Sequence, residues 1–349
     1  MNIFNTILLL FLSQTILFSQ QTTRTLLFDG SEREYILYIP ANYDNFDALP
    51  LLFNFHGGSG YAADYLNFES DMRSIADTAG CILVYPQALA DPNDGGSTNW
   101  IHKDPTDHDD VYFVEALIDT LSYEFNIDNK RVYVCGYSLG GEFTYALMCR
   151  LNNKIAAGAA VARTMQNYHY NNCSPVHPTG MMSILGTDDS ISPYDGLSWN
   201  GETYYVSADD MHSYWANFNN SNTDPIEEAV PNTNLNDGST VDRRMWLNDD
   251  GCVYVMELRV NGGGHDWPGS NGNMDINSNS EIWNFVSSFD IDGKMECSTT
   301  FVQKHPFSKG ESELLKSINL LGQKAKYLPN MPIIEIYHDG TFRKKVIVE

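Results

Sequence analysis

Residues 131–141 read Arg-Val-Tyr-Val-Cys-Gly-Tyr-Ser-Leu-Gly-Gly, an apolar run followed at once by a serine between glycines. The residues that follow have helical character, so this stretch predicts a strand, a very tight turn and a helix. In such a turn the serine takes a strained backbone geometry that pushes its hydroxyl clear of the sheet, and side chains in place of the glycines would collide. We therefore expect Ser138 to be a nucleophile. The alternative is a glycine-rich connection with no catalytic role.

A serine hydroxyl needs a base, and the base needs an orienting carboxylate. The apolar run Met181–Leu185 is followed by Gly-Thr-Asp-Asp at 186–189, and the run Val253–Val260 by Asn-Gly-Gly-Gly-His at 261–265. Behind this kind of serine turn, the chain order is nucleophile, acid, histidine. We expect His265 to be the base, with either Asp188 or Asp189 as its acid.

The oxyanion of an ester's tetrahedral intermediate needs preorganised N–H donors. The apolar strand Leu51–Phe55 ends in His-Gly-Gly-Ser-Gly at 56–60, a turn that can aim backbone amides at the site. One donor should come from Leu139, the residue after the serine, and one from this earlier loop, where we choose Gly58. His56 is interpreted as a support for the loop and not as a catalytic group.

Together these motifs resemble a family of secreted esterases that includes polyhydroxybutyrate depolymerases, feruloyl esterases and acetylxylan esterases. The matching pieces span about residues 25–290 and include His-Gly-Gly at 56–58, Val-Tyr-Pro-Gln at 84–87 and Gly-Gly-Gly-His-Asp-Trp-Pro-Gly at 262–269. The family pattern Gly-Thr-x-Asp implies that the acid is Asp189. The resemblance also implies an α/β-hydrolase fold and a serine ester hydrolase acting through an acyl-enzyme.

The expected substrate is a feruloyl or acetyl ester on a polysaccharide, with a polyester as the alternative. Trp100 and Trp267 could stack on an aromatic acyl group or a sugar, or could simply pack against loops. A non-catalytic carbohydrate-binding module with a vestigial triad would not need Ser138, Asp189 and His265 together. A peptidase could use the same three residues.

Short buried-type strands alternate with helical stretches along the chain, which predicts a mostly parallel sheet with helices on both faces. A hairpin is expected around Asp29-Gly30. The helical stretches lie near Tyr65–Ala79, Asp110–Phe125 and Glu142–Leu151. Residues 190–242 are long and polar, with one helix near Ala208–Phe218, and should lie over the active-site edge.

Four segments are predicted. Residues 1–20 carry no charged side chain and have an apolar core typical of a signal peptide; 21–296 form the esterase domain; 297–311 form a linker; and 312–349 form a small C-terminal β appendage. The last segment resembles the end of a type IX secretion sorting domain, which implies the type IX machinery as a partner. We expect a secreted or cell-surface protein, with no membrane span in the mature chain.

Composition supports export and limits the partners. The net charge is −24, and the tail from Cys297 onward carries eight Lys/Arg against five Asp/Glu, a net +3. So acidic a protein would repel nucleic acids, and none is expected to bind. In an oxidising compartment we expect Cys149, Cys173, Cys252 and Cys297 to form disulfides of undetermined pairing, and Cys81 and Cys135 to be buried thiols. No spacing suggests a metal site, and no cofactor is expected.

Overall fold

The computed structural model describes residues 20–91, 95–100 and 109–297, together with the backbone of strands at 314–319, 332–337 and 342–346. Two compact units divide between Cys297 and Ser298. Apart from Gln20 and Cys297, the predicted signal segment and linker lie outside the described residues.

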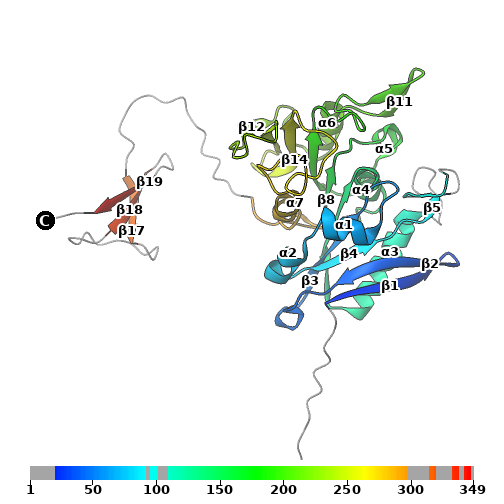
Figure 1. Ribbon diagram of the computed structural model, residues 1–349. Helices are drawn as coiled ribbons and strands as arrows, with labels where there is room; N and C mark the ends of the chain where they lie inside the picture. Colours follow the sequence, from blue (N-terminus) through cyan, green and yellow to red (C-terminus); the bar gives the residue numbers. More distant parts are fainter. Residues whose placement is uncertain are drawn as a thin grey trace, which may run out of the picture. The chain divides into compact units, whose positions relative to one another are not determined.

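A ten-stranded sheet forms the centre of the first unit (Figure 1). Its strands are β1 (Gln21–Phe28), β2 (Ser31–Tyr38), β3 (Leu49–Phe55), β4 (Ile82–Pro86), β7 (Ile127–Tyr137), β8 (Ala157–Val161), β9 (Gly180–Gly186), β12 (Ile226–Ala229), β13 (Thr240–Leu247) and β14 (Val253–Asn261). They lie in the order β1-β2-β4-β3-β7-β8-β9-β14-β13-β12. The central strands from β4 to β14 pair in parallel, and antiparallel strands extend the sheet at both edges. The predicted mostly parallel sheet is confirmed.

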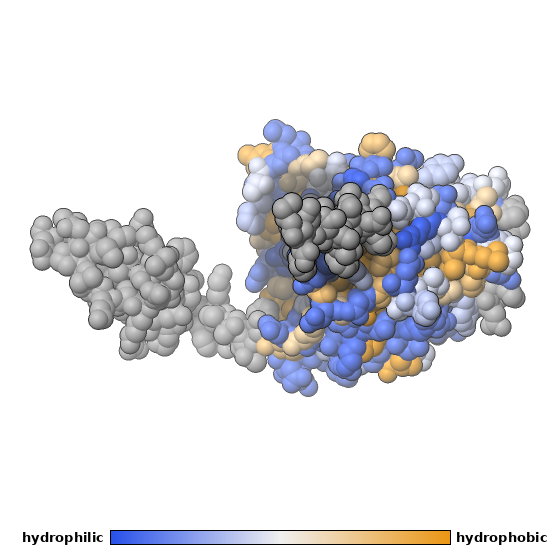
Figure 2. Space-filling model, turned by 90° about the horizontal axis from the view of Figure 1, so that it is seen from below, coloured by the Kyte–Doolittle hydropathy of each residue, from blue (hydrophilic) through white to orange (hydrophobic). Residues whose placement is uncertain are grey.

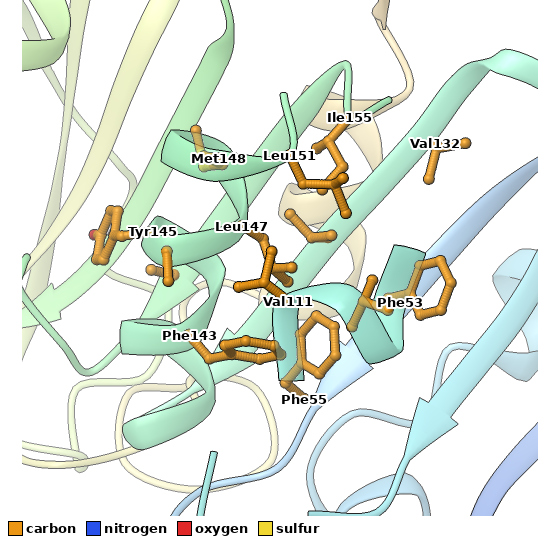
Figure 3. Close-up of a cluster of buried hydrophobic side chains, with 14 of the residues drawn as sticks. Phe53, Phe55, Val111, Val132, Phe143, Tyr145, Leu147, Met148, Leu151 and Ile155 are labelled. Carbon is orange, nitrogen blue, oxygen red and sulfur yellow. The ribbon is translucent and has the colours of Figure 1, made fainter. Parts of the chain in front are cut away.

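Helices cover both faces of this sheet, as predicted. They are α1 (Ala62–Phe68), α2 (Arg73–Ala79), α3 (Asp110–Glu124), α4 (Leu139–Arg150), α5 (Asn167–Asn172), α6 (Ala208–Phe218) and α7 (Ser278–Val286), with a short 3-10 turn at Tyr43–Asn45. Side chains alternate along a strand, so each face has its own core. One core joins the sheet to α3, α4 and α6, and the other joins it to α1, α2 and α7. Figure 3 shows part of the first, where Phe55 of β3 lies beside Phe143 of α4, with ring centroids 4.9 Å apart.

The helix expected at Tyr65–Ala79 is two helices, so that prediction is wrong in its detail. The chain breaks because Ser70 is drawn into the core. Its Oγ donates to Asn54 Oδ1 at 3.1 Å, and the Tyr85 hydroxyl donates to its carbonyl at 2.6 Å. The expected hairpin at Asp29-Gly30 is confirmed, with φ of 47° and 73° at its two turn residues.

The segment 190–242 holds the expected helix α6, but it also holds a hairpin that we did not predict. This hairpin pairs β10 (Leu197–Trp199) with β11 (Glu202–Tyr205). Two further small pairs are β5 (Ala90–Asp91) with β6 (Ser97–Thr98) and β15 (Phe289–Asp290) with β16 (Gly293–Lys294).

The cysteines behave as predicted. Disulfides join Cys149 to Cys173 and Cys252 to Cys297, while Cys81 and Cys135 are buried free thiols. The first bond ties α4 to the segment after α5. The second closes the first unit at its last residue.

The C-terminal unit contains a three-stranded antiparallel sheet of β17 (Leu314–Asn319), β18 (Pro332–Tyr337) and β19 (Phe342–Val346). This agrees with the predicted β appendage. No helix in the described parts of either unit is long and apolar enough to cross a membrane. On the face seen in Figure 2, hydrophilic residues predominate and hydrophobic ones gather in small groups.

Candidate active site

The predicted site residues gather at one edge of the sheet. Ser138 follows β7, Asp189 comes shortly after β9, and His265 comes shortly after β14. The His-Gly-Gly loop follows β3. All four strands run in parallel, so their carboxyl ends meet at this edge, where ligands of open α/β sheets bind.

The serine turn has the strained geometry that the sequence predicts. Ser138 has φ 53° and ψ −118°, a region that residues with a side chain rarely occupy. A Cβ on Gly136 would lie 2.3 Å from the Gly140 carbonyl, and one on Gly140 would lie 2.1 Å from the carbonyl oxygen of Phe55. Only glycine fits at either place, so the turn brings α4 tightly against β3 and β7.

Three side chains form one hydrogen-bonded line. His265 Nε2 lies 2.9 Å from Ser138 Oγ, and His265 Nδ1 lies 2.7 Å from Asp189 Oδ2. His265 is 127 positions from Ser138 and 76 positions from Asp189 in the chain, so the fold brings the three residues together. A neutral imidazole that donates from Nδ1 to Asp189 can accept the serine proton at Nε2.

Asp189 is buried and Asp188 is exposed, although both follow the same strand. Burial raises the pKa of Asp189, but hydrogen bonds from His265 and from the N–H groups of Ser192 and Ile191 outweigh it and hold the pKa below its ordinary value. Both backbone donors lie 2.8 Å from Oδ1. The carboxylate is thus ionised and fixed in orientation at neutral pH.

Gly58 and Leu139, the expected oxyanion donors, lie next to each other. A Cβ on Gly58 would come 2.5 Å from Leu139 Cδ1, and one on Gly57 would come 3.3 Å from Ser138 Cβ. Leu139 is the first residue of α4, so its N–H has no partner within the helix and lies at the positive end of the helix dipole.

His56 supports this loop from within the core, as expected. Its Nδ1 donates to the Gly57 carbonyl at 2.7 Å, and its Nε2 accepts from the Ala88 N–H at 3.1 Å. Burial lowers the pKa of His56 to about 4, against the opposing effect of the Gly57 hydrogen bond. The ring is neutral at ordinary pH and is not available to a substrate.

Trp100 and Trp267 are each 1% exposed, so the predicted stacking on substrate is wrong for both. Trp100 stacks on Phe143 at 5.0 Å, and its Nε1 donates to the His56 carbonyl at 2.9 Å. Trp267 packs edge-on against Tyr65 and Tyr137. Each indole packs against a loop of the candidate site, in agreement with the packing alternative.

Two residues that support the site through hydrogen bonds were not predicted from the sequence. The Tyr137 hydroxyl donates to the His265 carbonyl at 2.7 Å, and the rings of these residues lie 5.2 Å apart. Thr187 Oγ1 accepts from the Gly262 N–H at 2.8 Å. Both positions lie inside quoted motifs, but nothing in the motifs says what these hydroxyls bind. Among the described residues, no cluster of three or more His, Cys, Asp or Glu side chains is placed to hold a metal ion.

A family model described as "alpha/beta hydrolase fold" matches residues 52–263, more than half of the chain. The chain is 28% identical over 274 residues to a bifunctional acetylxylan esterase/xylanase of Neocallimastix patriciarum, covering 77% of this chain and 35% of that protein. It is 27% identical over 265 residues to feruloyl esterase B of Piromyces equi, covering 74% and 46%. The chain thus spans less than half the length of these two relatives.

Among solved structures, an acetyl xylan esterase from Aspergillus awamori superposes with a TM-score of 0.55 at 14% identity. The match covers 77% of this chain and 99% of that one. At so low an identity the likeness concerns the fold alone.

Proposed function

This chain belongs to the α/β-hydrolase family whose model it matches, and from that premise we propose that it is a serine carboxylic-ester hydrolase. The observation that carries the proposal is the hydrogen-bonded line from Ser138 through His265 to Asp189, with distances of 2.9 and 2.7 Å. Three polar groups far apart in sequence meet in the geometry of nucleophile, base and orienting acid.

In the proposed reaction, Ser138 Oγ attacks the ester carbonyl while His265 Nε2 accepts the proton of the serine hydroxyl. The Gly58 and Leu139 N–H groups hold the oxyanion, and Asp189 stabilises the imidazolium. His265 then protonates the leaving alcohol, which departs and leaves an acyl-enzyme. Water, deprotonated by His265, attacks the acyl group, and the collapse of this second intermediate returns the proton to Ser138.

We propose feruloyl or acetyl esters of polysaccharides as the substrates. Support comes from the relatives, which are named as acetylxylan and feruloyl esterases. A polyester of the polyhydroxybutyrate type is the alternative in the same reaction class. Export is also proposed, because residues 1–20 carry no charged side chain and two disulfides suit an oxidising compartment.

A substrate panel with a matched Ser138→Ala variant tests the function. We expect the wild type to hydrolyse p-nitrophenyl acetate, methyl ferulate and acetylated xylan faster than polyhydroxybutyrate or peptides. The variant should lose about 10⁶-fold in kcat while its melting profile stays unchanged. Phenylmethylsulfonyl fluoride should modify the wild type at Ser138, mapped by mass spectrometry, and leave the variant unmodified. Turnover of every ester by the variant at the wild-type rate would contradict the proposal, and an inert wild type would favour a vestigial triad.

A further inference from the structure

Trp199 differs from every other tryptophan of the chain. All six tryptophans fall within the described residues, and Trp199 is 66% exposed whereas the other five are buried or half-buried. Exposing so large an apolar ring to water is unfavourable, and Leu197 and Tyr204 of the same short segment are exposed as well. A grouping of exposed apolar side chains, unlike a single one, marks a binding surface. The ring is therefore a candidate contact for a ligand outside the triad.

The β10–β11 hairpin presents this ring on a sharply defined turn. Asn200 and Gly201 have φ of 51° and 83°, as in the two-residue turns that close tight hairpins. Ser198 Oγ and Thr203 Oγ1 lie 3.2 Å apart across the two strands. Trp199 directly precedes the turn, so its ring sits at the tip of a short ribbon.

The base of the hairpin is fixed to the helix that begins at the serine. The Tyr205 hydroxyl donates to Glu142 Oε2 and accepts from Arg163 Nη2 at 3.1 Å. The Arg163 guanidinium also lies 4.2 Å from the Tyr205 ring centre. Glu142 follows Ser138 by four positions on α4 and is fully buried. These contacts hold the hairpin at a set place relative to the nucleophile.

The hairpin leaves the same sheet edge as the triad. Its chain begins just after Asp189, at the carboxyl end of β9, and an isolated bridge between Gln166 and Tyr205 ties its end to the segment after β8. In Figure 1 it projects beyond α5 and α6. Its other exposed apolar side chains are Leu197 at 39% and Tyr204 at 49%. Both belong to the same short hairpin as Trp199, which groups three exposed apolar side chains in one place.

We propose that the β10–β11 hairpin is a carbohydrate-binding subsite that holds the sugar chain of a polymeric ester while the triad acts on its acyl group. The proposal rests on the proposed function and extends it. A pyranose ring has an apolar C–H face that packs on an indole, and its hydroxyls can bond with neighbours such as Ser198 and Asn200. A protein of net charge −24 repels anionic polymers, which argues against a polyanionic chain and favours an uncharged glycan as the occupant.

Binding is measured first in the inactive Ser138→Ala protein, so that the result does not depend on catalysis. Xylo-oligosaccharides should shift the tryptophan fluorescence to shorter wavelength, because Trp199 alone is exposed to water. A second substitution, Trp199→Ala, should abolish the shift and weaken binding about tenfold, the effect of losing one aromatic contact. Trp199→Phe should restore part of the affinity.

Kinetics in the active enzyme supply the second readout. The quantity compared is the ratio of kcat/KM for acetylated xylan to kcat/KM for p-nitrophenyl acetate. Trp199→Ala should lower this ratio about tenfold, because KM for acetylated xylan rises while its kcat stays the same. The matched control is Tyr123→Ala. Tyr123 is 96% exposed, but it lies at the end of α3, just before β7 begins. It is therefore near the amino ends of the parallel strands, whereas the triad lies at their carboxyl ends. This control should leave the ratio unchanged.

Two outcomes would overturn the subsite. One is an unchanged ratio in Trp199→Ala, whether kcat/KM falls equally on both substrates or on neither. The other is a loss seen only in the hydrolysis of polyhydroxybutyrate films or only in the binding of a protein partner. If the wild type hydrolyses no ester, the proposed function fails, and the oligosaccharide titration still decides the subsite independently.

Discussion

Asp188 and Asp189 provide a matched pair at the scale of single residues. Asp189 Oδ2 lies 2.7 Å from the imidazole, whereas the exposed Asp188 accepts from the Thr187 hydroxyl at 3.2 Å. Asp189→Asn should lower kcat by about 10⁴-fold, because an amide in that place stabilises the wrong tautomer of His265. Asp188→Asn should stay within a few-fold of the wild type. Steady-state kinetics with p-nitrophenyl acetate give the ranking, and the reverse ranking would overturn the assignment of the acid.

Tyr137 is a positioning residue, since it acts on the carbonyl of His265 and not on the reacting atoms. Tyr137→Phe removes the 2.7 Å hydrogen bond and should lower kcat about tenfold with little change in KM, because the imidazole is held less well. Tyr133→Phe is the control. It loses a similar bond, from its hydroxyl to the Phe289 carbonyl at 2.6 Å, at a buried point of the same strand. It should cost stability without lowering kcat, and equal kcat losses in both variants would refute a positioning role.

The hydrogen-bonded meeting of Ser138, His265 and Asp189 could be predicted from the sequence because each residue lies in a short motif next to an apolar strand. The supporting contacts could not. Trp100 and Trp267 lie near the site, as we expected, but their burial depends on partners such as Phe143 and Tyr65 that only the packed fold brings to them. A motif fixes local geometry; exposure is a property of the whole molecule.

At the scale of elements, the loop that follows β3 makes stability depend on pH through His56. The pKa of this imidazole is lowered from 6.5 to about 4 in the folded protein. Between these values the unfolded chain binds the extra proton, so stability is complete above about pH 6.5 and falls as the pH drops toward about 4. The loss from His56 should be about 3 kcal/mol.

Urea unfolding at about pH 7 and about pH 4.5 measures this effect. The pKa of His212 is also lowered by burial, so it adds a loss of the same sign. Carboxylates with lowered pKa, such as Asp189 and Asp242, lose their contribution only below 3.8. A His56→Gln variant should therefore show a shallower dependence in this window. The same slope in both proteins would rule out His56 as the titrating group.

The elements also show where sequence patterns are weak. The long buried strands and most helices follow from hydrophobic periodicity, and the parallel sheet follows from their alternation. The β10–β11 hairpin carries a clear signal in Asn200-Gly201, but its strands are too short to show alternation within a polar segment. The break between α1 and α2 depends on Asn54 of β3 and Tyr85 of β4, which the sequence around the break does not reveal.

At the scale of the whole molecule, charge and structure divide the chain at nearly the same place. The units separate after Cys297, and the net charge is +3 from that residue onward against −27 before it. The candidate catalytic residues all precede this point, and the Cys252–Cys297 disulfide closes the unit that holds them. The tail therefore has a composition of its own, which fits the proposal that it is a sorting signal recognised by type IX machinery.

Truncation directly after Cys297 tests that proposal. The shortened enzyme should keep its kcat on p-nitrophenyl acetate and its melting temperature, because the triad and both disulfides remain. In the organism of origin it should be retained in the periplasm instead of reaching the surface.

A control is a chain that ends one residue earlier. It loses the Cys252–Cys297 disulfide and should be less stable by about 2–4 kcal/mol, which separates the effect of the disulfide from that of the tail. If the tail were instead a structural appendage docked on the enzyme, its removal would expose apolar surface at about 25 cal/mol per Å². A large fall in melting temperature with unchanged export would then refute the sorting role, because a signal needs recognition by the export machinery and not contact with the enzyme.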